Sequence, residues 1–537
     1  MSTIFYGALI TPTSLTEYRA LPRALLSVSR DTGDIEWIED DVAASELQDA
    51  LARHDAVSEN VDFVELKLGE FLIPGFVDTH IHAPQVPNLG SGQEHELLDW
   101  LAEVTFPMEA RFADADFAKR AYSSVIKRTL DYGSTTCCYY GTLHLEGTKI
   151  LADVIHSYGA HPDPLRRNST RPRLTPQISP GQRAFVGKCN MDRNSPEYYV
   201  EPSADASLAA TRALIAHIQA LPPPTGSGTA AEPLVRPILT PRFAISCTGE
   251  LLDGLGKLAA EDAGLRIQTH ISENAAEIVF TKQLFPPGSL PAPPPLPDAA
   301  TTKAGGKVAN GKARETTYAG VYDAYGLLRH NTVLAHAVHL EEEEIAIIQA
   351  RRAGISHCPT SNFNLRSGCA RIGMLLDRGV KVGLGTDVSG GFSPSILTAV
   401  QHASMCSKVV ALHTESTPPD TRFTDRQLPI ATLFYLATLG GAEVCDLQAR
   451  IGSLAPGKAF DALVVSVRSE TGNPAIWGMD TAEELGMGLR DDGRTRTKTE
   501  EEELAGMLEK FLFCGDDRNV RRVYVQGRLV GGKESRV

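Results

Sequence analysis

Short apolar runs alternate with longer amphipathic segments along most of the chain. Eight runs follow an N-terminal stretch, at residues 71–82, 134–141, 183–191, 235–245, 265–273, 332–340, 354–362 and 380–390. The segments between them can be helical, as at 97–110, Ala204–Gln219 and 341–353. Buried strands that alternate with helices indicate parallel β/α units. Eight such strands favour an α/β fold of the (β/α)8 TIM barrel type over an open doubly wound sheet.

Strand-like pieces also occur near both ends of the chain, at 4–10, 61–68, 462–467 and 520–530. They predict a small β-sandwich-like domain built from residues 1–73 and 449–537, beside a barrel of residues 74–448. Three Pro/Gly-rich stretches interrupt the barrel pattern at about 161–176, 221–232 and 285–314. A charged stretch at about 468–505 interrupts the β domain. Because such compositions bury little apolar surface, we expect these four stretches to be insertions.

Composition limits the classes of function. The chain has 537 residues, 42% of them hydrophobic, and a formal net charge of −14. That charge disfavours a nucleic-acid or anionic-membrane partner. Nine cysteines without a C-x-x-C spacing predict reduced thiols. The first residues lack a basic leader with an apolar core, and no run approaches the roughly 18 to 20 apolar residues of a membrane span. We therefore expect a cytoplasmic protein.

Residues suited to metal chemistry stand at the ends of four of the eight runs. The first run ends in His80-Ile-His82. Side chains two residues apart on a strand lie on the same face, so these two histidines can face one metal ion. Later runs end in His270 and Glu273, in His336 and in Asp387. The carboxyl ends of barrel strands meet on one face, so these residues are expected to converge. Imidazoles with a carboxylate suit Zn²⁺ and leave a position for water.

Each of these residues also has an ordinary structural interpretation. His80 and His82 could lie on the surface, and a buried histidine is more often a hydrogen-bonded core residue than a ligand. Asp387, in Gly-Thr-Asp, could cap a helix. Their joint occurrence at matching strand ends favours the metal site.

The same stretches resemble the amidohydrolase superfamily. The resemblance rests on Pro-Gly-Phe-Val-Asp-Thr-His-Ile-His at 74–82, His-Ile-Ser-Glu at 270–273, Ala-His at 335–336, His-Cys-Pro-Thr-Ser-Asn at 357–362 and Gly-Thr-Asp at 385–387, with a closing segment at 452–465. Within that superfamily, His-Ala-Pro-Gln at 82–85, Val-Gly-Lys at 186–188 and Thr-Pro-Arg-Phe at 240–243 resemble guanine deaminases. The resemblance covers residues 74 to about 465, apart from the insertions.

The resemblance implies a zinc-dependent enzyme that converts guanine and water to xanthine and ammonia. It implies one Zn²⁺ per chain, with His80, His82, His270 and Asp387 as ligands. Zinc hydroxide would attack C2, with Glu273 as proton shuttle and Asp387 and His336 as helpers. The residues implied to bind substrate are His82, Ala83, Pro84, Gln85, Arg242, Phe243, His270, Glu273 and Asp387. The resemblance also implies a homodimer.

The residue types implied to bind substrate suit a planar, neutral base. Arg242 can donate hydrogen bonds to a ring carbonyl, and Gln85 offers both a donor and an acceptor. Phe243 offers a flat apolar face.

Other functions fit parts of the pattern. Zinc deaminases of the H-x-E type require a P-C-x-x-C, and none follows His339-Leu-Glu341. The resemblance implies that two-metal hydrolases of the superfamily need a bridging lysine at the fourth strand end, where this chain has none and Lys188 lies on the third run. Another mononuclear deaminase, acting on a triazine, cytosine or adenine-like base, stays open. So does a non-enzymatic scaffold, since fold does not fix function.

Overall fold

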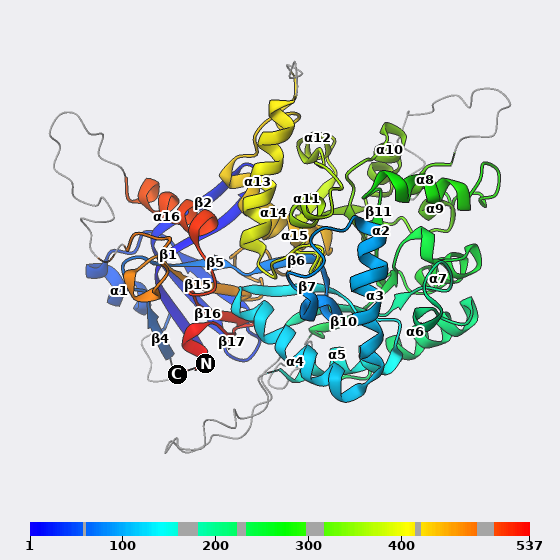
Figure 1. Cartoon of the computed structure of the whole chain (residues 1–537). Coiled ribbons are helices and arrows are strands. Elements are labelled where there is room, and N and C mark those ends of the chain that lie inside the picture. Colours follow the sequence, from blue (N-terminus) through cyan, green and yellow to red (C-terminus); the bar gives the residue numbers. More distant parts are fainter. Residues whose placement is uncertain are drawn as a thin grey trace.

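Two β-sheets of different strand direction organise the molecule. The structure, a computed structural model, describes residues 1–56, 61–158, 181–222, 232–296, 316–413, 420–478, 480 and 499–536. The predicted insertion at 161–176 lies outside these residues, as do most of 221–232 and residues 297–314 and 481–498 of the other two. In Figure 1 the sheet built from the two chain ends lies on the left, and the other sheet with its helices on the right.

The larger sheet is a parallel barrel whose strands follow one another in chain order. Its path is β14-β13-β12-β11-β10-β8-β7-β6, with β9 (Cys189–Asn190) paired to the end of β10. The strands are β6 (Phe76–His82), β7 (Ser134–Tyr140), β8 (Arg183–Gly187), β10 (Val235–Pro241), β11 (Arg266–Ile271), β12 (Thr332–His336), β13 (Gly354–His357) and β14 (Lys381–Leu384). Each lies in one of the eight predicted runs, so the (β/α)8 prediction is confirmed.

Hydrogen bonds between the first and last strands close this barrel. Thr79 Oγ1 donates to the Leu384 carbonyl at 2.8 Å, and Asp387 N donates to the His80 carbonyl at 2.8 Å. The buried Asp78 carboxylate accepts from Thr386 N at 3.0 Å and from Thr386 Oγ1 at 2.6 Å. The seam of the barrel therefore holds His80 next to Asp387.

Helices cover the barrel from outside, as predicted. Residues 97–110 form three consecutive helical segments, α2 (Leu97–Trp100), the π-type η3 (Leu101–Thr105) and α3 (Phe106–Ala110). The other helices of the barrel region are α4 (Ala115–Asp131), α5 (Leu145–Ser157), α6 (Ala204–Gln219), α7 (Gly249–Glu261), α8 (Ala275–Leu284), α9 (Tyr318–Ala324), α10 (Glu342–Arg351), α11 (Pro359–Asn364), α12 (Ile372–Asp377), α13 (Ile396–Leu412), α14 (Ile430–Ala437) and α15 (Leu439–Val444). Within the described ranges, no helix has the length and apolar character needed to cross a membrane.

The second sheet is mixed and draws its strands from both ends of the chain. Its order is β17-β16-β15-β5-β1-β2-β3, with β4 paired to β1. The strands are β1 (Ser2–Ser14), β2 (Glu17–Ser29), β3 (Ile35–Glu39), β4 (Val61–Glu65), β5 (Glu70–Pro74), β15 (Ala462–Ser466), β16 (Val520–Val525) and β17 (Arg528–Gly531). Helices α1 (Leu47–Arg53) and α16 (Glu500–Cys514) flank it (Figure 1). This confirms a β domain built from both ends.

The first predicted run needs a correction, because it is two strands rather than one. Residues 71–74 belong to β5 of the mixed sheet, and only 76–82 enter the barrel. The chain changes sheets at Gly75, where a Cβ atom would lie 2.1 Å from Thr135 Oγ1 and could not be accommodated. Gly75 N also donates to the Asp461 carbonyl at 2.9 Å. Apolar patterning cannot separate two buried strands that are joined by one residue.

One continuous core holds the two sheets together. Phe71, Ile73 and Leu463 of the mixed sheet share a buried apolar cluster with Val125 and Leu130 of α4. A buried ion pair adds to it, with Arg183 Nε donating to Asp461 Oδ2 at 2.8 Å. The strand ends of the barrel are therefore held on a rigid base.

Candidate active site

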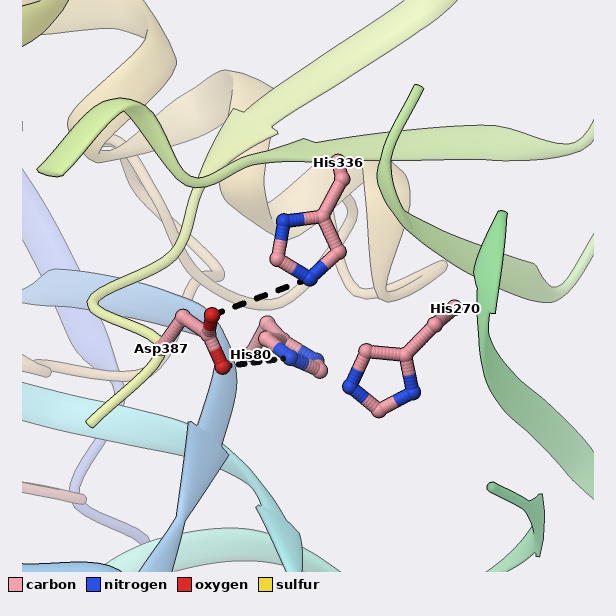
Figure 2. Close-up of side chains that lie close together, drawn as sticks. All are labelled: His80, His270, His336 and Asp387. Carbon is pink, nitrogen blue, oxygen red and sulfur yellow. Dashed lines mark ion pairs between the residues drawn. The ribbon is translucent and has the colours of Figure 1, made fainter. Parts of the chain in front are cut away.

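The predicted histidines and aspartate converge at the carboxyl ends of the barrel strands. His80 and His82 end β6, His270 lies in β11, His336 ends β12, and Asp387 follows β14. Ligand atoms of His80, His270, His336 and Asp387 all lie within 4.8 Å of one another. Figure 2 shows these four side chains grouped together. We call these four residues, together with His82, the histidine cluster.

His82 belongs to the cluster by its distances. Its Nε2 lies 3.1 Å from His270 Nε2 and 3.3 Å from Asp387 Oδ1. The same aspartate oxygen lies 2.9 Å from His80 Nε2. The imidazole rings of β6 thus approach one carboxylate oxygen together, as the i, i+2 spacing predicts.

Hydrogen bonds behind two of the rings fix which nitrogen faces the cluster. His270 Nδ1 lies 2.5 Å from the Arg242 carbonyl, and His336 Nδ1 lies 2.9 Å from Asn362 Oδ1. Because a carbonyl oxygen can only accept, each Nδ1 carries a proton, and each Nε2 faces the cluster. Partners of this kind orient histidines that bind metals.

Strained backbone accompanies the cluster. His336 and Asp387 have φ values of 76° and 46°, in the left-handed region that residues other than glycine rarely occupy. Such outliers gather at functional sites, where surrounding structure holds them in place.

The donor set of the cluster fits a metal ion. Both ring nitrogens of His80, Nδ1 of His82 and Nε2 of His336 are buried, and no described residue gives them a hydrogen bond of good geometry. Burial lowers the pKa of His82 to about 4 and that of His270 well below its usual value, so both rings are neutral. Burial opposes ionisation of Asp387, but His80 and His336 hold its pKa well below the usual range. Neutral imidazoles beside an ionised carboxylate can hold a metal ion and fit zinc chemistry.

Glu273 lies beside this cluster in a different protonation state. Its Oε1 accepts from Ser367 Oγ at 3.2 Å, and its Oε2 lies 3.4 Å from His336 Nε2. Burial, with the nearby charges of Asp387 and Glu277, raises its pKa well above the usual value. A protonated carboxyl group at this point can donate a proton to a bound molecule.

A pocket of about 380 Å³, part of it open to solvent, lies directly over the cluster. Leu97, Trp100, Leu101, Phe243 and Leu365 give it apolar walls. Its polar lining consists of His82, Gln85, Arg242, His270, Glu273, Glu277, His336 and Asp387. Apolar walls combined with converging polar groups are typical of a small-molecule site.

Two polar residues of the pocket lining, Gln85 and Arg242, are tied to one buried carboxylate, Glu109 of α3. Arg242 donates to it from Nη1 at 2.7 Å and from Nη2 at 3.1 Å. Gln85 Nε2 donates at 2.8 Å, and the Tyr199 hydroxyl at 2.6 Å. We call Glu109, Gln85, Arg242 and Tyr199 the Glu109 network.

The comparisons with known proteins agree with this geometry. Residues 71–530 match the Amidohydrolase family. "Probable guanine deaminase" of Schizosaccharomyces pombe is 40% identical over 532 residues, which are 99% of this chain and 84% of the relative. The chain belongs to the guanine deaminase branch of the amidohydrolase family. Guanine deaminase of Dictyostelium discoideum is 34% identical over 536 residues, 98% of either chain.

A solved structure resembles this amidohydrolase over its whole length. It is guanine deaminase from C. acetobutylicum with bound guanine in the active site, 29% identical, with a TM-score of 0.73. The match covers 99% of this chain and 100% of that chain. The enzyme fold therefore extends through both sheets.

The amidohydrolase site contains most of the residues expected from the sequence. The cluster, Glu273, Gln85, Arg242 and Phe243 all line or adjoin the pocket. Ala83 and Pro84 are buried in the short helix η2 (Ala83–Asn88) and are not among the described residues that line it. Glu109 was not predicted, because it lies in a helical segment without a motif. Only its place between the apolar stretch Phe106-Pro-Met and Ala110 distinguishes it.

Proposed function

We propose that this protein hydrolyses guanine to xanthine and ammonia. The observation that carries the proposal is one pocket that is lined both by residues of the histidine cluster and by Gln85, Arg242 and Phe243. Arg242 can donate to the carbonyl of guanine, and Phe243 can cover the face of its ring. The guanine deaminases among the relatives support this choice of base.

One Zn²⁺ per chain, held by His80, His82, His270 and Asp387, would make a bound water acidic enough to lose a proton near neutral pH. His336 Nε2 lies 3.7 Å from Asp387 Oδ2 and 3.4 Å from Glu273 Oε2. The ring therefore connects two carboxyl groups, and it can pass the proton of the attacking water between them.

Glu273 completes the proposed reaction by moving protons at the base. Water adds across the bond between C2 and the neighbouring ring nitrogen, and Glu273 protonates that nitrogen. Glu273 then takes the proton of the new C2 hydroxyl and delivers it to the C2 amine, so the carbon–nitrogen bond breaks, ammonia leaves and the C2 carbonyl of xanthine forms. The first proton of the attacking water, passed on through His336, restores the Glu273 carboxyl group. Proton transfer by a placed carboxyl group contributes roughly 10²- to 10⁴-fold in rate.

The test is to incubate the zinc-loaded protein separately with guanine, adenine and cytosine and to follow each ultraviolet spectrum and ammonia release. We expect conversion of guanine alone and a zinc content near one per chain. No conversion of guanine would refute the proposal, and two metal ions per chain would favour a two-metal hydrolase. A scaffold without activity predicts no ammonia from any base.

We also infer that the protein is a cytoplasmic homodimer. All nine cysteines are free, which suits a reducing compartment, and the dimer follows from the family resemblance. Light scattering should give the mass of two chains, and cell fractionation should recover the protein in the cytosol. A one-chain mass or a membrane-bound fraction would contradict this inference.

A further inference from the structure

Glu109 is a fully partnered carboxylate. Each of its oxygens accepts two hydrogen bonds, Oε1 from Gln85 Nε2 and Arg242 Nη2, and Oε2 from Arg242 Nη1 and the Tyr199 hydroxyl. A carboxylate offers about four acceptor positions, so none remains for a ligand. Glu109 is 0% exposed and is not among the described residues that line the pocket. It therefore acts through its partners.

The first consequence concerns the amide of Gln85. An ionised carboxylate can only accept, so Nε2 rather than Oε1 must face Glu109. On the other side the Ser389 N–H donates to Gln85 Oε1 at 3.0 Å. The two contacts forbid rotation of the amide by 180°. One N–H and one Oε1 acceptor position are left for a molecule in the pocket.

The second consequence concerns the geometry of Arg242. Glu109 binds both terminal nitrogens of the guanidinium group, and Phe106 covers it with a ring centroid 5.2 Å from Cζ. The planar group is thereby fixed at one angle. Its remaining N–H groups can only donate, so they fit a carbonyl oxygen and not an amine.

The third consequence concerns charge. Burial disfavours both ions, yet each stabilises the other, so the pKa of Glu109 is lowered and that of Arg242 is raised. The pair is ionised and sums to zero charge. This end of the pocket therefore offers strong donors without net attraction for an anion.

We propose that Glu109 is a positioning residue that sets specificity: it fixes Gln85 and Arg242 as one rigid recognition unit and cancels the charge of Arg242, so that the pocket selects a neutral base bearing a ring carbonyl. The role rests on the proposed function for its substrate. Charge cancellation by Glu109 also explains product release. Xanthine, with two ring carbonyls, loses a proton more readily than guanine, and the xanthine anion finds no net positive charge at the Glu109–Arg242 pair.

The test compares Glu109→Gln with the wild type in guanine turnover and in inhibition by xanthine over a range of pH. A glutamine places an amide N–H against a donor of Gln85 or Arg242 and leaves the arginine charge uncompensated. We expect KM for guanine to rise at least about tenfold, with a smaller change in kcat. We also expect xanthine inhibition to tighten with rising pH, more steeply than in the wild type.

The matched control is Asp461→Asn, which removes a carboxylate charge from another buried arginine pair. Arg183 donates to Asp461 from Nε at 2.8 Å and from Nη2 at 3.2 Å, and neither residue lines the pocket within the described chain. This variant should lose stability while its KM and xanthine inhibition stay at the wild-type values. Equal changes in both variants would overturn the specificity role, as would a Glu109→Gln variant that behaves like the wild type.

Glu109→Asp keeps the charge and shortens the side chain, so it gives a second readout if Glu109→Gln does not fold. Its KM should rise while the pH dependence of xanthine inhibition stays unchanged; a steeper dependence would overturn the charge argument. If wild-type protein releases no ammonia from guanine, the proposed function fails on its own. Calorimetric titration of xanthine into the zinc-loaded variants then still tests whether removal of the Glu109 charge favours the anion.

Discussion

The histidine cluster and the Glu109 network border one pocket, but their polar atoms are partnered in opposite ways. In the cluster, buried nitrogens of His80, His82 and His336 lack a hydrogen bond of good geometry from any residue in the described ranges. In the network, all four acceptor positions of Glu109 are filled. His80 Nε2 and Asp387 Oδ1 lie 2.9 Å apart without hydrogen-bond geometry, as two ligands of one ion would.

The difference separates a region whose donor atoms fit a metal ion from one whose polar atoms are satisfied by the protein alone. Leaving a buried polar group without a partner costs about 1–3 kcal/mol, so a group of such nitrogens beside a carboxylate fits a metal-binding site. A saturated network is rigid before any ligand binds. The pocket thus combines a metal-dependent half with a preorganised half, and each half can be disturbed separately.

Loss of a metal ligand should have the largest effect. In His270→Ala we expect zinc content to fall and guanine turnover to drop at least about 10⁴-fold, because the ion that would make water nucleophilic near neutral pH is lost. Metal analysis and ammonia release measure the two effects. His357→Gln is the control, since this buried histidine also ends a barrel strand but lies outside the cluster. Its zinc content should match the wild type, and a similar loss there would contradict the assignment.

Removal of the proposed proton shuttle, Glu273, should have the second largest effect. Glu273→Gln keeps the shape of the side chain but cannot take up and release protons, so turnover should fall roughly 10²- to 10⁴-fold with zinc content unchanged. Glu277→Gln changes a neighbouring buried carboxyl group that accepts from Tyr318 at 2.6 Å, and its loss of turnover should be much smaller. Near-normal activity in Glu273→Gln would exclude the role.

A substitution in the Glu109 network should change the binding of guanine rather than the chemical step. Arg242→Lys replaces a planar fork by a single ammonium group that cannot bind both oxygens of Glu109. KM for guanine should rise about 10- to 100-fold, as expected for loss of a charge-assisted hydrogen bond in a buried site, while zinc content is retained. Steady-state kinetics with metal analysis measure both. Loss of zinc in this variant would show that the two halves of the pocket are not separable.

The two halves also differ in how far the sequence predicts them. The cluster residues each end an apolar run, so strand periodicity alone places them on one face of a barrel. Glu109 carries no such signal, because its partner Arg242 lies 133 residues later and their contact exists only in the folded chain. Its neighbours give an ordinary helix pattern.

The fold shows the same limit. The eight barrel strands were predictable because each lies in a different buried run, whereas the change of sheet at Gly75 inside the first run was not. That change depends on the side chain of Thr135, which approaches from a different strand. Local patterns thus reveal elements and their faces, and contacts between distant segments decide how a run is divided.

The smallest expected effect comes from Tyr199, a neutral member of the Glu109 network. Tyr199→Phe removes one hydrogen bond to Glu109 Oε2 and leaves its charge and both arginine contacts in place. If rigidity and charge reside in the Glu109–Arg242 pair, KM should rise only about two- to tenfold, because Tyr199 is not among the described residues that line the pocket and acts on it through Glu109. Xanthine inhibition should keep its wild-type pH dependence. Kinetics across pH make the measurement. An effect as large as that of Arg242→Lys would mean that the preorganised half depends on all four donors together and not on the ion pair.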